Sequence, residues 1–261
     1  MAEAPILTTS VPERTFDLGR AVQVTAASRG ISTVRLATEI MRRQMGRQRL
    51  SPQEYFLYGA HRAGLADEER DMFIGRKLGA RMSQALGSAQ HLSIAGVFRD
   101  KVLCDLLLRS FGLPVPRIQA VAGQVSSRLP YPVLGDPAAM VRFLDHEAAL
   151  PVFGKPVAES KSLGAISIIS RSEPGRLRLG DGRDVPSADF AEEVFRHFPR
   201  GYLFQDMLQP SRQVAPLTGP VIATARLVTL RVGSRISVLY GGIKWPGKGA
   251  MSDGAASLTS L

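Results

Sequence analysis

The sequence contains a single cysteine, Cys104, and no asparagine. One cysteine excludes an internal disulfide and a zinc site built from several cysteines. Its setting in "KVLCDLLL" predicts a buried apolar position. There is also no apolar run of transmembrane length. The first residues, "MAEAPILTTSVPERTFDLGR", carry acids and prolines where a signal peptide needs a basic and then an apolar stretch, so we expect a cytoplasmic protein without a membrane span.

Lysine is scarce as well, since 27 of the 33 basic residues are arginine. The net charge of +10 suits an anionic partner such as a nucleotide, a nucleic acid or an anionic lipid. Aromatic residues make up only 7% and are not interleaved with the basic stripe of Arg42, Arg43, Arg47 and Arg49. Stacking on nucleic-acid bases is therefore poorly supported, and we interpret the stripe as a solvated helix face.

The first third of the chain has the periodicity of helices. Residues 1–30 are expected to form an irregular lead-in, and residues 31–90 are expected to be mainly helical. Ser51, followed by proline and then Glu54, has the order of a capping box at a helix start. A helical N-terminal region over residues 1–95 follows from these patterns.

After a boundary near residues 92–98 the pattern changes to alternating helices and strands, which predicts an α+β fold. "FRDKVLCDLLLRSFG" reads as a helix that is followed by a strand near residues 118–121. Residues 151–157 and 165–170 read as the two arms of a hairpin. The segments "YLFQDML", "ATARLVTLRV" and "RISVLYGGI" read as further strands, the last two joined by a turn at Gly233.

Lys155 lies at the base of this hairpin, in "PVFGKPVAESKSLGAISIIS". A phosphate group is bound by positive charge and by free backbone N–H groups. Lys155 would supply the charge, and the small residues Ser160, Ser162 and Gly164 would supply the N–H groups. Lys101 begins the preceding helix and is a second candidate. Each lysine alone is equally explained by a side chain that reaches solvent.

The order of these parts resembles the ATP-grasp superfamily, in which ATP lies between two lobes. The chain is most similar to the sugar-transfer-associated ATP-grasp family, because "TARLVTL" matches its Thr-x-Arg-apolar-Val-Thr strand and "LSPQEYFLYGAHRAGL" matches its N-terminal region. The likeness covers roughly residues 35–255. It implies an ATP-grasp-like two-lobe fold with a helical region (1–95), a small lobe (96–203) and the start of a large lobe (204–261).

The resemblance implies that Lys101 and Lys155 touch ATP phosphates and that residues 159–165 form a flap over them. Backbone groups between the lobes would bind adenine, and basic residues of the large lobe would face the phosphates. The residues implied for these two roles are Gln205, Asp206, Met207 and Leu208 for adenine, and Arg226 and Lys244 for the phosphates. The implied chemistry is attack of a carboxylate on the γ-phosphate, followed by capture of the acyl phosphate by an amine or a related nucleophile. Such a ligase would act in cell-envelope or polysaccharide metabolism on substrates that the sequence leaves unidentified.

The expected Mg²⁺ site is incomplete in the sequence. Family members supply two acids and an asparagine, whereas here only Asp253 matches the first acid. Leu261 ends the chain soon after Asp253, so we expect an incomplete large lobe. The alternatives are a non-catalytic nucleotide-binding protein and, more weakly, a basic nucleic-acid-binding protein. "GGIKWPGKGA" resembles a P-loop, but Gly249 replaces its Ser/Thr, and we interpret it as a turn.

Overall fold

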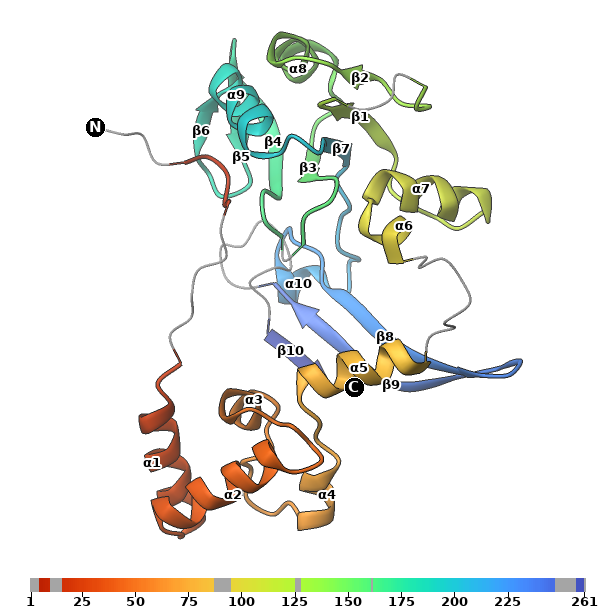
Figure 1. Cartoon of the computed structure of the whole chain (residues 1–261). Coiled ribbons are helices and arrows are strands. Elements are labelled where there is room, and N and C mark those ends of the chain that lie inside the picture. Colours follow the sequence, from red (N-terminus) through yellow and green to blue (C-terminus); the bar gives the residue numbers. More distant parts are fainter. Residues whose placement is uncertain are drawn as a thin grey trace. The chain divides into compact units, whose positions relative to one another are not determined.

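The computed structural model describes residues 5–9, 16–86, 95–124, 128–160, 162–246 and 257–260 (Figure 1). The chain forms two compact units. One is Pro12–Ser93, and the other combines Met1–Val11 with Ile94–Leu261. The first unit thus lies inside the region predicted to be helical, but the first residues of the chain cluster with the second unit. No helix in the described ranges is long and apolar enough to cross a membrane.

The first unit is helical, and we call it the helical unit. Its described helices are α1 (Leu18–Arg29), α2 (Thr33–Met45), α3 (Pro52–Leu57), α4 (Asp67–Asp71) and α5 (Arg76–Leu86). Their shared core contains Leu36, Leu50 and Tyr55, each fully buried. The predicted capping box is confirmed, because Ser51 and Glu54 each bond the other's backbone N–H.

The expectation of an irregular lead-in is wrong for α1. Asp17 caps this helix by accepting a hydrogen bond from the N–H of Arg20, and Gly30 ends it with a left-handed φ of 63°. Both signals are present in the sequence. Helix α1 has no distinct apolar face, so the spacing of its apolar residues did not predict a helix.

The second unit is a mixed α/β structure, and we call it the sheet unit. Its described helical segments are α6 (Ala95–Arg99), α7 (Lys101–Ser110), α8 (Pro137–Arg142), the π-helical turn η1 (Phe143–Glu147), α9 (Ser187–His197) and α10 (Ala215–Thr218). Its larger sheet contains β1 (Ile118–Ala122), β2 (Val133–Leu134), β3 (Val152–Pro156), β4 (Ile166–Glu173), β5 (Arg176–Leu179), β6 (Asp184–Pro186) and β7 (Tyr202–Asp206). The strand order is β2-β1-β7-β3-β4-β5-β6.

This sheet is mixed, since β1 and β2 are parallel and the remaining neighbours are antiparallel. The predicted α+β class is therefore compatible with the structure. The predicted hairpin is present as β3 and β4, which pair in antiparallel register. The helix that was predicted to begin near Lys101 begins at that residue, with Asp100 as its N-cap.

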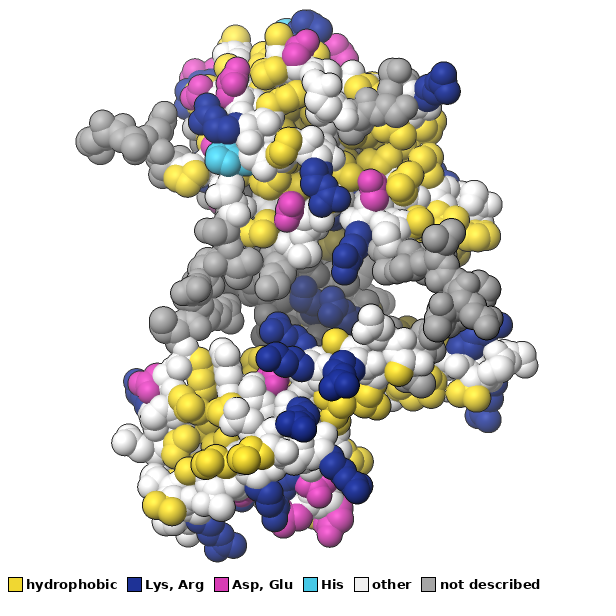
Figure 2. All heavy atoms as spheres, viewed as in Figure 1, with side chains coloured by type: hydrophobic (Ala, Val, Ile, Leu, Met, Phe, Trp, Pro, Cys, Tyr) yellow, Lys and Arg dark blue, Asp and Glu magenta, His cyan; other side chains and the backbone are white. Residues whose placement is uncertain are grey.

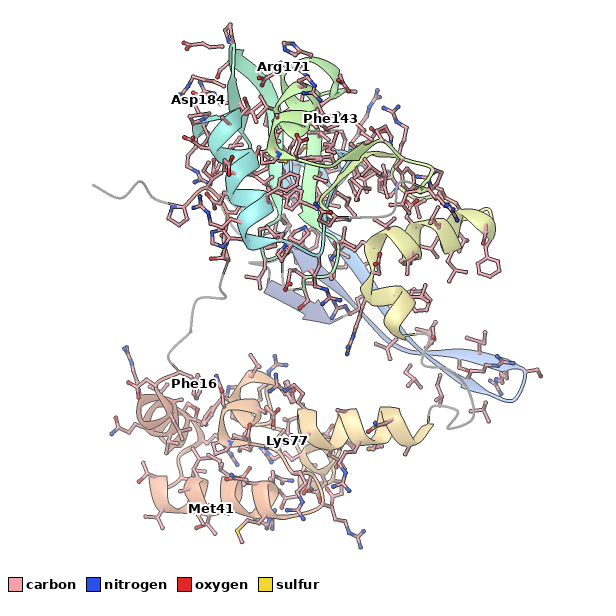
Figure 3. All side chains as sticks on the ribbon, turned by 45° about the horizontal axis from the view of Figure 1, so that its top comes forward. Phe16, Met41, Lys77, Phe143, Arg171 and Asp184 are labelled. Carbon is pink, nitrogen blue, oxygen red and sulfur yellow. The ribbon has the colours of Figure 1, made fainter. Side chains whose placement is uncertain are left out.

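The two faces of the sheet differ in what covers them. Helices α8 and α9 pack on one face, where Val152, Tyr202 and Phe204 belong to the main hydrophobic core (Figure 1). Figure 3 shows Phe143 and Arg171 near each other on this side of the unit, where Arg171 donates to the carbonyls of Leu144 and Ala148. The opposite face carries a smaller cluster, which includes Val157 and Leu203 and reaches α7 through Val102.

The N-terminal segment, residues 5–9, packs on the sheet unit. The backbone N–H groups of Ile6 and Leu7 donate to the Glu193 carboxylate of α9 at 2.9 and 2.6 Å. Leu7 is 2% exposed and belongs to the main core. The Thr8 carbonyl accepts a hydrogen bond from the N–H of Gly164 at 2.8 Å. The segment is thereby joined to the end of the hairpin loop.

A second, three-stranded sheet has the order β10-β9-β8, with β8 (Thr224–Val232), β9 (Arg235–Trp245) and β10 (Ser257–Ser260). Both neighbouring pairs are antiparallel. Gly233 has a φ of 60° in the turn that joins β8 to β9, so the predicted hairpin is confirmed. These strands follow β7 in the chain through residues 207–223, which include α10.

Candidate functional site

Three neighbouring strands place a row of side chains on the sheet face that α8 and α9 leave uncovered. Phe153 of β3 lies between Gln205 of β7 and Ser167 of β4 in the paired register. Directly paired residues project to the same face of a sheet. Lys155 projects to this face as well, because it lies two residues after Phe153 on one strand.

This row lines a pocket of about 240 Å³, which we call the Lys155 pocket. The pocket wall is mostly apolar, and Lys155 is its only charged residue among those described. The lining residues are Pro116, Phe153, Lys155, Ser167, Gln205, Met207, Leu208, Pro220, Val221, Ile222 and Thr224. A concave apolar wall with a few polar groups is the usual form of a small-molecule site.

The Lys155 ammonium has no hydrogen-bond or ion-pair partner within the described part of the chain. Its nearest contact of note is the Phe153 ring, whose centroid is 5.9 Å from Nζ. Burial, together with the positive charge of Lys101, lowers the pKa of Lys155 from 10.5 to about 8. The Asp105 carboxylate raises that pKa, but its oxygens already accept hydrogen bonds from Arg109 and Tyr131. An anion in the pocket would relieve this cost of an unpaired charge.

The hairpin loop that follows Lys155 is built from turns. The carbonyls of Ser160 and Ser162 accept hydrogen bonds from the N–H groups of Leu163 and Ala165. Ser162 has a φ of 58° and Gly164 a φ of 64°. Ser160 is exposed, Ser162 is half-buried and Gly164 is buried. Among the described residues of the predicted flap, only Glu159 and Ser160 are therefore exposed.

Position 164 requires glycine because of its close neighbours as well as its positive φ. A Cβ at this position would lie 2.4 Å from the Phe198 ring and 2.7 Å from Pro156. The Tyr202 hydroxyl donates to the Gly164 carbonyl at 2.7 Å, and Tyr202 in turn packs closely on Gly154. Gly154 therefore leaves room for the Tyr202 ring, whose hydroxyl holds the end of the loop, and Gly164 leaves room for Phe198 and Pro156.

Lys101 has partners that differ from those the sequence suggests. Its ammonium donates to the carbonyls of Pro156, Val157 and Glu159 at 2.9, 3.2 and 2.6 Å. Burial lowers the pKa of Lys101. Lys101 is absent from the lining of the Lys155 pocket. Lys155 thus lines the pocket, whereas Lys101 binds the backbone at the start of the hairpin loop.

The segment predicted to bind adenine leads out of β7 into the pocket. Gln205, Met207 and Leu208 line it, and Gln205 is 9% exposed. Asp206 is absent from the lining. Its N–H donates to the Arg117 carbonyl, and its carboxylate accepts from Arg117 and Gln119, which lowers its pKa.

The two basic residues predicted in the large lobe share one face of the second sheet. Lys244 is paired directly with Thr224, and Arg226 lies two residues after Thr224 on β8. Thr224 lines the Lys155 pocket. The register therefore places Arg226 and Lys244 on the sheet face to which Thr224 belongs. Arg226 is exposed and Lys244 is partly buried.

The described residues contain no cluster of acidic side chains that would indicate a magnesium site. Asp253, the predicted ligand, lies outside them. Within the described ranges no group of three or more His, Cys, Asp or Glu side chains could hold a metal ion. We therefore assign no ligand to Mg²⁺.

The stripe of Arg42, Arg43, Arg47 and Arg49 is not one solvated face. Arg43 is 1% exposed and forms ion pairs with Asp67 and Asp71, whereas Arg42 is 65% exposed. Figure 2 shows acidic side chains of α4 gathered on the surface of the helical unit. Asp67 and Asp71 of α4 thus pair with part of the positive charge of α2.

Several residues of the pocket were not singled out in the sequence. Beside Lys155, the pocket is lined by Phe153, Ser167, Pro220, Val221, Ile222 and Thr224. The spacing of Phe153 two residues before Lys155 is a signal that could have indicated the first of them. Ser167 carries no such signal, because only strand pairing places it opposite Phe153. A larger hollow of about 600 Å³ lies beside Ile6 and α9 and contains none of the predicted site residues.

Comparisons with known proteins found no similar protein. No protein-family model matches this chain, and neither the curated proteins nor the solved structures contain a match.

Proposed function

We propose that the chain binds ATP in the Lys155 pocket and belongs to the ATP-grasp-like proteins. The observation that carries the proposal is the half-buried ammonium of Lys155, which has no partner among the described residues and is the only charged group among those of them that line the pocket. A phosphate is an anion that such a charge would bind by charge-assisted hydrogen bonds. Phe153, Met207 and Leu208 offer the apolar wall that a flat purine ring prefers.

Strand register gives further support for an adenine contact near Met207. β3 and β7 pair up to Val152 and Asp206, so Pro151 lies opposite Met207 by continuation. Proline has no N–H and cannot donate to the Met207 carbonyl. That carbonyl would be an acceptor for the exocyclic amine of adenine.

The proposed reaction is ATP-dependent ligation. A substrate carboxylate would attack the γ-phosphorus, ADP would leave, and an amine or related nucleophile would displace phosphate from the acyl phosphate. Positive charge on Arg226 and Lys244 would stabilise the transferred phosphoryl group. Because the described residues supply no metal site, we derive no step through Mg²⁺.

The first test is calorimetric titration of the full chain with ATP, with and without Mg²⁺. Lys155→Met should weaken ATP binding by at least about tenfold, because one charge-assisted phosphate contact is lost. Lys77→Met, in exposed α5 of the helical unit (Figure 3), is the matched control and should leave the affinity unchanged.

The outcomes of this titration separate the alternatives. Binding that requires Mg²⁺ would favour the ligase, and binding that does not would favour a non-catalytic nucleotide-binding protein. Absence of binding to the folded wild-type chain, or equal affinity of the Lys155→Met variant, would contradict the proposed site.

A further inference from the structure

Lys101, the first residue of α7, donates hydrogen bonds from both its side chain and its backbone to carbonyls within residues 156–159. The ammonium donates to the carbonyls of Pro156, Val157 and Glu159. The backbone N–H of Lys101 also donates to the Val157 carbonyl, at 3.1 Å. Four hydrogen bonds from a single residue therefore hold the junction between β3 and the hairpin loop.

Lys101 and Lys155 differ in how many of their ammonium N–H donors have an acceptor. An ammonium has three N–H donors. In Lys101 all three have carbonyl partners, whereas the Lys155 ammonium has no partner among the described residues. A phosphate could reach Lys101 only by displacing a carbonyl, and the carbonyl would then lose its charged donor.

We propose that Lys101 is a positioning residue, a latch that holds residues 156–159 and thereby fixes Lys155 and the start of the loop at the pocket. The adjacent backbone is held from the other side as well, because the Val157 N–H donates to the Gly201 carbonyl at 2.9 Å. The latch is a property of the ligand-free chain. Its value for ATP binding rests on the proposed function.

The charge of Lys101 also acts on its neighbour. It is one of the causes of the low pKa of Lys155, after burial. Removing that charge should raise the pKa of Lys155 toward its ordinary value. If Lys101 contacted only phosphate in the complex, substituting it would not change the protection of the loop from hydrogen exchange in the ligand-free chain.

The test is hydrogen exchange of the ligand-free full-length chain. Lys101→Met removes the three side-chain donors at similar length, and we expect the Val157 amide, which donates to Gly201, to exchange at least about tenfold faster. Lys101→Arg keeps charge and donors and should restore much of the protection, and Lys77→Met should change nothing at the loop. Unchanged exchange in a folded Lys101→Met variant would overturn the latch.

A measurement on the wild-type chain covers the case in which Lys101→Met does not fold. Nitrogen-15 NMR can follow the exchange of the six lysine ammonium groups with water. The signal that is lost in Lys101→Arg is that of Lys101. The latch predicts slow exchange at Lys101 relative to exposed Lys77. Equally fast exchange would reject it. ATP titration of the same samples tests the proposed function separately, because the latch is read without nucleotide.

Discussion

At the scale of the residue, the charge that would let Lys155 bind an anion also destabilises the folded chain. Its half-buried ammonium has no anionic partner among the described residues, and its pKa falls from 10.5 to about 8. The unfolded chain therefore holds this proton more tightly than the folded chain does. The consequence is a destabilising contribution that is fully present below pH 8 and is relieved as the pH rises from about 8 to 10.5.

Lys155→Met should therefore stabilise the chain at pH 7. The gain should not exceed about 3 kcal/mol, which corresponds to the lowering of the pKa. Denaturant unfolding at several pH values measures it. The advantage of the variant over wild type should shrink between pH 8 and 10.5, and a constant difference over this range would contradict the assigned pKa.

The same titration should appear in ligand binding. Above pH 8 the Lys155 amine of the free chain is increasingly neutral, so a phosphate must bring a proton with it. ATP affinity of the wild-type chain should fall as the pH rises from 8 to 9, by at most about tenfold. Calorimetry in two buffers of different ionisation enthalpy would detect the proton uptake, and affinity that is independent of pH would argue against a Lys155–phosphate contact.

At the scale of the element, the N-terminal segment acts as part of the sheet unit although it precedes the helical unit in the chain. Glu193 fixes the backbone of Ile6 and Leu7, and the Thr8 carbonyl holds Gly164. A few residues of irregular backbone thereby complete the core beneath α9 and anchor the loop. Their effect on stability comes mainly from Leu7, which is 2% exposed.

Leu7→Ala should destabilise the sheet unit by about 2–5 kcal/mol, the usual cost of removing a buried leucine side chain. Hydrogen exchange resolved by region measures the effect, and faster exchange is expected in α9 and at Gly164. Leu217→Ala is a suitable control in the same unit, because Leu217 is 73% exposed. Equal effects of the two substitutions would show that residues 5–9 do not contribute to the core.

At the scale of the whole molecule, each of the two compact units has a hydrophobic core of its own. The helical unit is built around Leu36, Leu50 and Tyr55, and the sheet unit around a larger cluster that includes Tyr202 and Phe204. Each unit also carries its own buried polar contacts, such as the Arg29–Glu39 ion pair at 3.0 Å in the helical unit. Separate cores predict separate unfolding.

Leu50→Ala should lower the stability of the helical unit by about 2–5 kcal/mol while exchange in the sheet unit stays unchanged. ATP affinity should change less than about twofold, or about 0.4 kcal/mol, because the described residues that line the Lys155 pocket belong to the sheet unit. Thermal unfolding followed by regional hydrogen exchange distinguishes the units. Parallel loss of protection in both would mean that they unfold as one cooperative body.

Local chemistry in the sequence determined much of the element structure. The capping box at Ser51 and Glu54, the helix start at Lys101, and the arms around Lys155 depend on residues close together in the chain. Such signals act through backbone geometry and neighbouring side chains, so they can be interpreted without the fold. Helix α1 was not predicted, because its capping residues flank a segment without a distinct apolar face.

Tertiary structure decided what the two lysines contact. Both were candidates for phosphate, and nothing in the sequence separates them. Strand pairing places Phe153, Gln205 and Ser167 beside Lys155, while the end of β3 brings three carbonyls to Lys101. The sequence by itself determined which elements form and where positive charge lies. Only the packing of residues distant in the chain determined which of the two lysines is left without a partner among the described residues, because burial and hydrogen-bond saturation depend on the whole fold.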